Sequence, residues 1–143
     1  MSNFTHIDTQ GRVRMVDVTE KKPTLRIAVA QGVVSMNSET FEKIMSRTTA
    51  KGNVLETARI AGIMAAKNTS GLIPMCHPLN IRHISIDFFP DKANTFIRIE
   101  SKVQIIDQTG VEMEALTAVS IAGMAGMDVI TVKIVRKELI ITS

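Results

Sequence analysis

Two short segments of this chain carry side chains that can move protons. In the first, the only cysteine, Cys76, and the neighbouring His77 follow Met75 between two prolines, so they sit on a backbone with little freedom. Histidine titrates near neutral pH, which suits acid–base chemistry or a hydrogen bond to a ring. Adjacent side chains in an extended segment point in opposite directions, so Cys76 could equally be a small buried apolar residue and His77 a structural one.

The second segment places Glu112, Met113 and Glu114 in the predicted first turn of a helix. Carboxylates in that turn complement the positive end of the helix dipole, which is a purely structural explanation for both. Side chains two positions apart on a helix do not face each other, so the pair is not expected to form a carboxylate dyad. One glutamate could therefore face a ligand while the other pairs with a cation or with another subunit.

Four cationic side chains could hold an anion. Lys51 lies just before a helix predicted to begin at Val54, where free N–H groups favour negative charge. Its ammonium group could also transfer a proton, or Lys51 could be a solvated loop residue. Arg26 opens a predicted strand and could reach a pocket at the end of the sheet. Arg59 and Lys67 lie on the predicted helix, and all three could equally be surface residues.

Composition limits the class of protein. At 143 residues a single domain is expected, with an irregular segment over residues 1–25. The net charge of +3 suits an anionic small molecule and does not require nucleic acid. One cysteine and three scattered histidines match no metal-ligand spacing. The lone cysteine, the polar N-terminus and the lack of a long apolar run predict a cytoplasmic protein with no membrane partner.

The hydrophobic pattern predicts the order strand, helices, strand, strand, helix, strand. The strands are expected over residues 26–36, 84–88, 97–105 and 129–142, and the helices over residues 38–45, 54–67 and 111–124. Gly32 could form a bulge in the first strand, and residues 71–79 are expected to be a loop. This is the βαββαβ order of a ferredoxin-like α+β fold. Because the strands alternate apolar and polar residues, we expect an antiparallel sheet with helices on one face.

Several longer runs resemble the MoaC family, the cyclic pyranopterin monophosphate synthases of molybdenum cofactor biosynthesis. The runs span residues 15–18, 51–55, 58–67, 73–79 and 109–118. The resemblance implies a lyase that converts 3′,8-cyclo-7,8-dihydroguanosine 5′-triphosphate to cyclic pyranopterin monophosphate and releases pyrophosphate. It also implies a ferredoxin-like fold and a hexamer built as a trimer of dimers, with the sites at subunit contacts. No redox cofactor is implied, although Mg²⁺ could accompany the triphosphate.

The resemblance also implies roles for individual residues. Lys51 matches the family's catalytic lysine, a general acid/base. The positions that match its substrate-binding segments are Met75, Cys76, His77, Glu112, Met113 and Glu114. Arg26 and Lys67 match basic positions that could hold the triphosphate, a task that suits arginine better than lysine.

The chain departs from the family after the second long helix. Family members carry a Tyr-Asp-Met-Cys-Lys run there, with a catalytic aspartate and a second catalytic lysine. Here Asp128 lies at the expected distance from Glu114, but Thr131 stands in place of the lysine. Asp128 could be a general acid/base in a changed setting. Alternatively a loop is absent and Asp128 leads the last strand, which the pattern over residues 126–130 favours.

Two other classes of function stay open from the sequence. A catalytically impaired relative, or a ferredoxin-like binding or regulatory module, would bind a ligand without turnover. RNA-binding sheets of this shape stack bases on aromatic side chains. The predicted hairpin has only Phe88, Phe89 and Phe96, so no nucleic-acid partner is expected.

Overall fold

The computed structural model of this chain describes residues 10–13, 23–47 and 52–125, together with the backbone of residues 131–142. A four-stranded antiparallel sheet with the order β2-β3-β1-β4 forms its frame. Its strands are β1 (Thr24–Ser35), β2 (Ile81–Asp91), β3 (Phe96–Asp107) and β4 (Thr131–Thr142). Its helices are α1 (Ser38–Ser46), α2 (Val54–Lys67), α3 (Thr69–Leu72) and α4 (Glu112–Met124).

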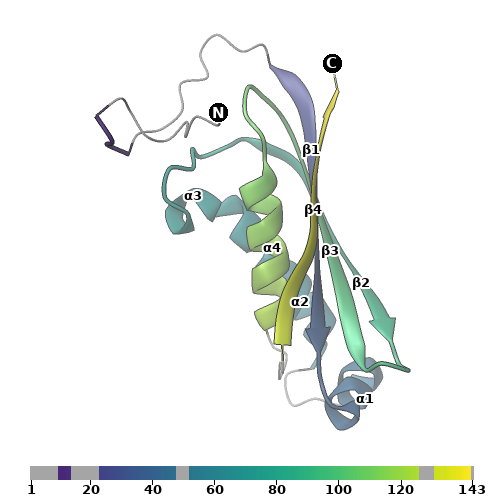
Figure 1. Cartoon of the computed structure of the whole chain (residues 1–143). Helices are drawn as coiled ribbons and strands as arrows, with labels where there is room; N and C mark the ends of the chain where they lie inside the picture. The colour runs from purple at the N-terminus through teal and green to yellow at the C-terminus, as the bar shows by residue number, and fades with distance from the viewer. Residues whose placement is uncertain (1–9, 14–22, 48–51, 126–130, 143) are drawn as a thin grey trace.

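The predicted ferredoxin-like α+β fold is confirmed. The two long helices, α2 and α4, lie on one side of the sheet, and α1 lies at the end where β1 stops (Figure 1). The central strands are β3 and β1. The connection through α1, α2 and α3 leads from β1 to the edge strand β2, and the connection through α4 leads from β3 to the other edge strand, β4. The predicted single-sided covering by helices is therefore also present.

Side-chain caps explain where the first two helices begin. The Asn37 side chain accepts a hydrogen bond from the backbone N–H of Thr40 at 2.8 Å, at the start of α1. Asn53 does the same for Glu56 at 3.2 Å, at the start of α2. Each cap satisfies one N–H group that has no partner within the helix.

Two local features differ from the expectation. The segment after α2 was expected to be a loop, but residues 69–72 form the short helix α3. The buried Thr69 hydroxyl donates to the carbonyl oxygens of Ala65 and Ala66, at 3.1 and 3.0 Å, and this holds α3 against the end of α2. The bulge expected at Gly32 of β1 is in the neighbouring strand instead. The register between β1 and β4 shifts between Gln31 and Gly32, and the additional residue lies in β4.

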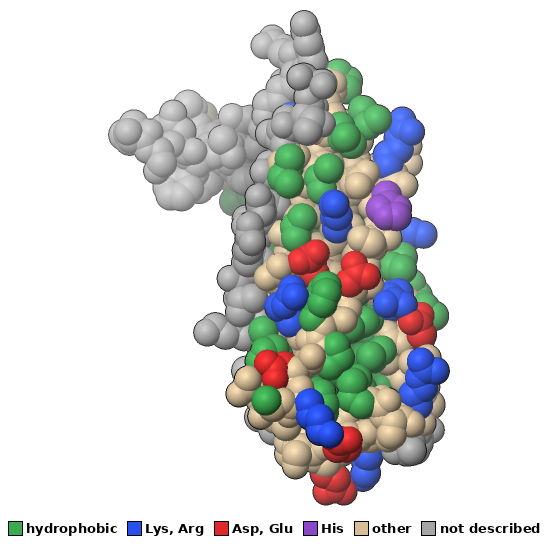
Figure 2. All heavy atoms as spheres, turned by 90° about the vertical axis from the view of Figure 1, so that its right-hand side faces the viewer, with side chains coloured by type: hydrophobic (Ala, Val, Ile, Leu, Met, Phe, Trp, Pro, Cys, Tyr) green, Lys and Arg blue, Asp and Glu red, His purple; other side chains and the backbone are tan. Residues whose placement is uncertain are grey.

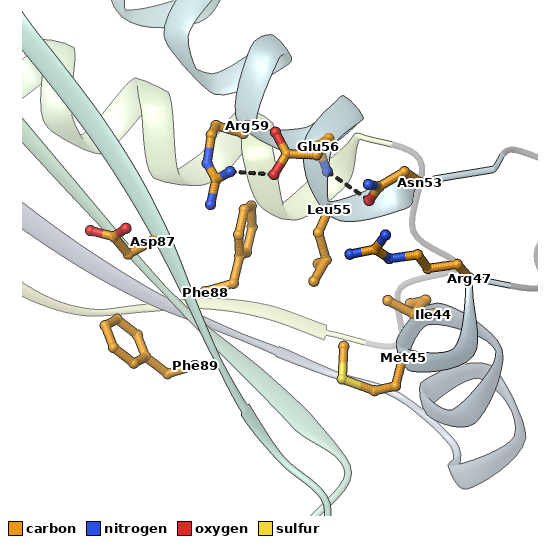
Figure 3. A pocket seen from close by; sticks show the side chains of 10 residues that line it. All are labelled: Ile44, Met45, Arg47, Asn53, Leu55, Glu56, Arg59, Asp87, Phe88 and Phe89. Carbon is orange, nitrogen blue, oxygen red and sulfur yellow. Dashed lines mark hydrogen bonds and ion pairs between the residues drawn. The ribbon is translucent and has the colours of Figure 1, made fainter.

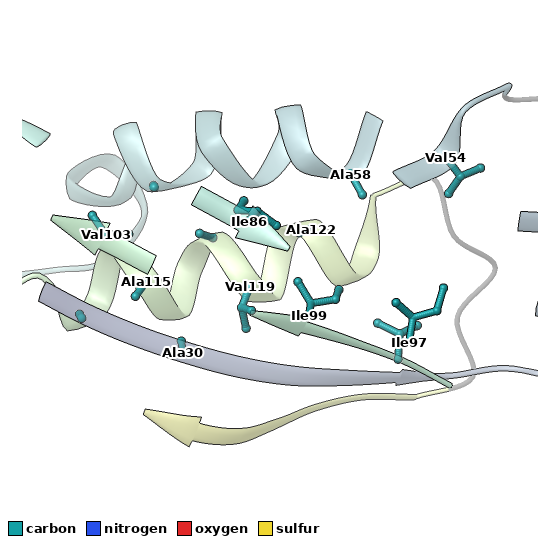
Figure 4. Close-up of a cluster of buried hydrophobic side chains, with 14 of the residues drawn as sticks. Ala30, Val54, Ala58, Ile86, Ile97, Ile99, Val103, Ala115, Val119 and Ala122 are labelled. Carbon is teal, nitrogen blue, oxygen red and sulfur yellow. The ribbon is translucent and has the colours of Figure 1, made fainter. Parts of the chain in front are cut away.

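The hydrophobic core lies between the sheet and the two long helices (Figure 4). Every second side chain of β3 from Ile97 to Ile105 is buried there, as the alternating pattern predicts. In β1 the buried face carries Ala28, Ala30 and Val34, whereas the larger Ile27 and Val29 lie on the other face. Small residues of α2 and α4 face the buried side chains of the sheet and bring the helices close together. A Cβ atom built on Gly62 of α2 would lie 3.0 Å from the carbonyl oxygen of Ala118 and 3.1 Å from Cβ of Ala122, both on α4.

The opposite face of the sheet carries no helix among the described residues. Figure 2 looks onto this face, where hydrophobic side chains are interspersed with charged ones. Phe89, Ile106 and Ile140 are 41%, 46% and 39% exposed. Arg98 stacks over the Phe89 ring, 4.0 Å from its centroid. Helices long and apolar enough to cross a bilayer do not occur in the described part of the chain.

We predict that Gly62→Ala destabilises the fold. Alanine normally favours a helix interior by about 1 kcal/mol over glycine. Here its methyl group would push α4 away from α2, so we expect a net loss of about 1–2 kcal/mol in the free energy of unfolding. Denaturant titration measures it, and Ile60→Ala on the exposed side of α2 is the control. A Gly62→Ala protein at least as stable as the parent would contradict this packing.

Candidate functional site

Segments far apart in the sequence meet at the end of the sheet where β1 begins. Arg26 of β1 and Ile81, the first residue of β2, both pair with Ile105 of β3. The loop over residues 73–80 therefore enters the sheet at this end, and the connection from β3 to α4 leaves it there. The structure thus brings together Arg26, the Met75–His77 segment and the first turn of α4.

The loop before β2 contains a strained turn. Cys76 donates its backbone N–H to the carbonyl oxygen of Ile73, at 3.4 Å, across Pro74 and Met75. Met75 has a φ of 69°, in the left-handed region that glycine or asparagine normally occupies. Such a conformation costs a non-glycine residue on the order of 1–3 kcal/mol and is concentrated at functional sites. The proline-braced segment is therefore held in one unusual conformation, as its sequence predicts.

A buried carboxyl group and a thiol lie close enough at this end to interact electrostatically. Glu114 is only 4% exposed. Burial is the main cause that raises the pKa of its carboxyl group, and the charge of Glu112 raises it further. Burial also raises the pKa of the Cys76 thiol, and the nearby charge of Glu114 acts in the same direction. Cys76 is therefore suited to be a neutral thiol rather than a thiolate nucleophile, and Glu114 can retain a proton.

The other residues of these two segments are more accessible. His77 is exposed, while Met113 and Glu112 are half-buried. The Glu112 carboxylate turns back over Gly110, where a Cβ atom would lie 2.7 Å from its Oε1. The two glutamates therefore point in different directions, as their spacing predicts, but remain close enough to influence each other electrostatically.

Arg26 has an unusual environment at the start of β1. Its Nε atom is buried and has no hydrogen-bond partner within the described ranges, and the same is true of the Thr24 hydroxyl. Both residues are on the side of β1 that continues into the buried Ala28 and Ala30. A buried guanidinium nitrogen without a partner is costly, so an anion at this position would compensate it.

Lys67, at the end of α2, borders a cleft of about 250 Å³ at the start of β2. The cleft is also lined by Arg82 and His83, which the sequence analysis did not select. His83 was interpreted only as a polar residue that alternates with the apolar residues of a strand, and Arg82 was not interpreted. The structure shows that three basic side chains share this cleft.

A larger pocket of about 430 Å³ lies near the start of α2, between α1 and β2. Figure 3 shows Arg47 and Arg59 entering it from different elements, with Leu55 and Phe88 between them. Arg59 donates through Nε to the carbonyl oxygen of Ile86 at 2.9 Å, stacks on Phe88 and is paired with Glu56. Arg59 is therefore a brace between α2 and β2 rather than a plain surface residue.

The predicted acid/base residues Lys51 and Asp128 lie outside the described residues. Their nearest described neighbours are Gly52, which has a φ of 77°, and Thr131, which opens β4 opposite Ser35. Within the described ranges, no three His, Cys, Asp or Glu side chains are close enough to hold a metal ion.

These features define an α+β protein with a carboxyl and thiol site at one end of a ferredoxin-like sheet. The chain belongs to the MoaC family, whose family model matches residues 15–143. Proteins of Desulforapulum autotrophicum and Desulfatibacillum aliphaticivorans, both named cyclic pyranopterin monophosphate synthase, are each 56% identical over 128 residues. These matches cover 90% of this chain and 78% and 80% of those proteins. A protein of the same name from Magnetococcus marinus is 48% identical over 141 residues, with 99% of this chain and 85% of that protein covered.

We predict that Glu114→Gln stabilises the protein at neutral pH. Because the pKa of Glu114 is raised in the folded state, the folded protein holds a proton that the unfolded chain loses above about pH 4.5. The free energy of unfolding of the parent therefore falls as the pH rises from about 4.5 to the higher pKa of Glu114 in the folded protein. Glu114→Gln removes this decline.

Urea titrations at several pH values measure the effect. Glu39→Gln, at an exposed position of α1, is the control and should change stability by less than about 0.5 kcal/mol. If Glu114→Gln and the parent keep the same dependence on pH, the carboxyl group is not in the environment described.

Proposed function

We propose that this chain converts 3′,8-cyclo-7,8-dihydroguanosine 5′-triphosphate to cyclic pyranopterin monophosphate in molybdenum cofactor biosynthesis. The reaction would rearrange the purine-derived rings, close a cyclic phosphate and release pyrophosphate. The names of its relatives support this proposal at 56% identity over most of the chain. The structural observation that carries it is that both specific motifs lie at the same end of the sheet, one in the loop that enters β2 and the other at the start of α4 after β3.

The cations at this end suit the triphosphate. Arg26 offers a buried Nε without a hydrogen-bond partner among the described residues. Lys67, Arg82 and His83 border one cleft. A chain of phosphates needs several positive groups along its length, and a guanidinium can bind two oxygens at once. We therefore assign the triphosphate to the region between Arg26 and this cleft.

The motif segments would then contact the ring system. Met75, Cys76 and His77 lie on the strained loop, and Glu112, Met113 and Glu114 begin α4. A glutamic acid that retains its proton can donate a hydrogen bond or a proton to a ring nitrogen or oxygen. Cys76 as a neutral thiol would contribute shape and a weak hydrogen bond. Lys51 would act as the general acid/base, and Asp128 is a second candidate for that role.

A complete site on this plan requires more than one copy of the chain. Asn53 and Lys67 mark opposite ends of α2, which has 14 residues and is therefore about 20 Å long. Lys51 lies two residues before Asn53 in the sequence. His77 lies on the loop that follows α3, near the C-terminal end of α2 at Lys67. We propose that one subunit supplies Lys51 and another supplies the motif segments, within a homo-oligomer that is a hexamer arranged as a trimer of dimers.

The remaining properties follow from the proposed reaction. We propose a single synthase-like domain over residues 1–143, since the described helices and strands share one hydrophobic core and one sheet. The proposed reaction needs no redox cofactor. Mg²⁺ could bind together with the triphosphate, and activity assays with and without EDTA test whether the reaction depends on it. The cytoplasm is the proposed compartment, and the proposed partners are the substrate and further copies of the chain.

We predict that purified protein releases pyrophosphate from the enzymatically prepared cyclised intermediate. Lys51→Ala should lower kcat by at least about 100-fold, because general acid–base groups contribute that much. Lys43→Ala, at an exposed position of α1, should match the parent. A coupled pyrophosphate assay measures both. Tight binding of the intermediate without turnover by the parent would instead identify a catalytically impaired relative.

We predict that two inactive variants complement each other. Lys51→Ala and His77→Ala co-expressed in one cell should form mixed oligomers in which some sites receive both intact residues. Random pairing within dimers would restore roughly a quarter of the parental activity. His77→Ala with Glu114→Ala is the matched control, because both residues come from the same end of one subunit. Equal activity in the two mixtures would exclude a shared site.

A further inference from the structure

Gly110 lies in the connection between β3 and α4, two positions before the first helical residue, Glu112. The N-cap of α4 is Val111, which makes no side-chain capping hydrogen bond. The Glu112 carboxylate occupies the space that a side chain at Gly110 would need. A Cβ atom there would lie 2.7 Å from Oε1 and 2.8 Å from Cδ of Glu112, and would also touch Oε2.

Backbone conformation does not explain the glycine at this position. The described glycines with a positive φ are Gly11 and Gly52, so Gly110 adopts a φ open to other residues. Its nearest neighbours are three atoms of one side chain, Glu112. The absence of a side chain at Gly110 therefore leaves room for the Glu112 carboxylate, and the backbone conformation between β3 and α4 does not require a glycine.

The position of this carboxylate has consequences for two neighbouring groups, the carboxyl group of Glu114 and, through it, the thiol of Cys76. Its charge is one cause that raises the pKa of Glu114, and the charge of Glu114 in turn acts on the Cys76 thiol of the facing loop. These three groups form a linked set drawn from α4 and from the loop before β2. If the Glu112 carboxylate moves away from Glu114, its charge no longer raises the pKa of Glu114.

We propose that Gly110 is a positioning residue, which seats the Glu112 carboxylate over its own Cα so that this carboxylate meets the substrate beside Glu114. The role in substrate contact rests on the proposed function, whereas the seating of Glu112 does not. Alanine at position 110 would displace the end of a flexible side chain and leave the backbone in place. The fold would therefore persist while the carboxylate moves.

The test compares Gly110→Ala with Gly71→Ala. Gly71 is the matched control because a Cβ atom there meets nothing within 4 Å and its φ is not positive. We expect both variants to unfold at the parental temperature. We expect Gly110→Ala to lower kcat/KM at least about tenfold, since small misplacements of a substrate-contacting group are costly. Gly71→Ala should keep the parental value.

A double-mutant cycle separates positioning from a general structural effect. On a Glu112→Ala background, Gly110→Ala should cause no further loss, because there is no carboxylate left to displace. The alkaline limb of the pH–rate profile, where Glu114 loses its proton, should move to lower pH in Gly110→Ala, since the charge that raises the pKa of Glu114 is then more distant. Additive losses in the cycle would overturn the proposal.

Carboxyl-carbon NMR titration supplies a measurement that does not depend on turnover. Gly110→Ala should lower the pKa of Glu114, and Gly71→Ala should not. If the parent shows no turnover but this shift occurs, the proposed reaction fails while the seating of Glu112 stands. If the parent is active and Gly110→Ala matches Gly71→Ala in rate and titration, the positioning role is wrong.

Discussion

The close contact between α2 and α4 is the constraint on which the rest of the structure depends. A Cβ atom at Gly62 would lie 3.0 Å from the carbonyl oxygen of Ala118, which is tighter than most Cβ contacts, and would overlap the Ile86 side chain of β2. Because both helices also pack on the sheet, their small residues determine how far each helix stands from the other. The end of α2 and the start of α4 are thereby held near each other, and the loop over residues 73–80 runs from α3 into β2 at the same end of the sheet.

This arrangement gathers unfavourable local features at one end of the molecule. Met75 has a left-handed backbone, Glu114 is buried, and the Arg26 Nε has no hydrogen-bond partner among the described residues. Each of these features costs stability that well-packed residues elsewhere must offset. The alternating core of β1 and β3 and the short contact between the helices provide such packing. The unfavourable features are concentrated at the end of the sheet where the two specific motifs lie, which supports a functional rather than a structural origin for them.

Much of the fold could be predicted because its determinants are local. Apolar and β-branched patterns marked the four strands, and the helix starts predicted at residues 38 and 54 coincide with the side-chain caps of Asn37 and Asn53. The short helix α3 was not predicted, since it depends on the Thr69 hydroxyl returning to the carbonyl oxygens of α2. Arg82 and His83 were overlooked because alternation alone does not distinguish a solvated face from the wall of a cleft.

The sequence by itself determined the class of fold, the family and the chemical types gathered in the two motifs. These follow from spacing and residue identity, which do not require knowledge of distant contacts. Only the tertiary structure decided that Glu114 is buried within electrostatic reach of Cys76, that Glu112 turns back over Gly110, and that Lys67 shares a cleft with Arg82. Burial and electrostatic coupling are properties of neighbours in space, and the helix contact that creates those neighbours joins residues far apart in the chain.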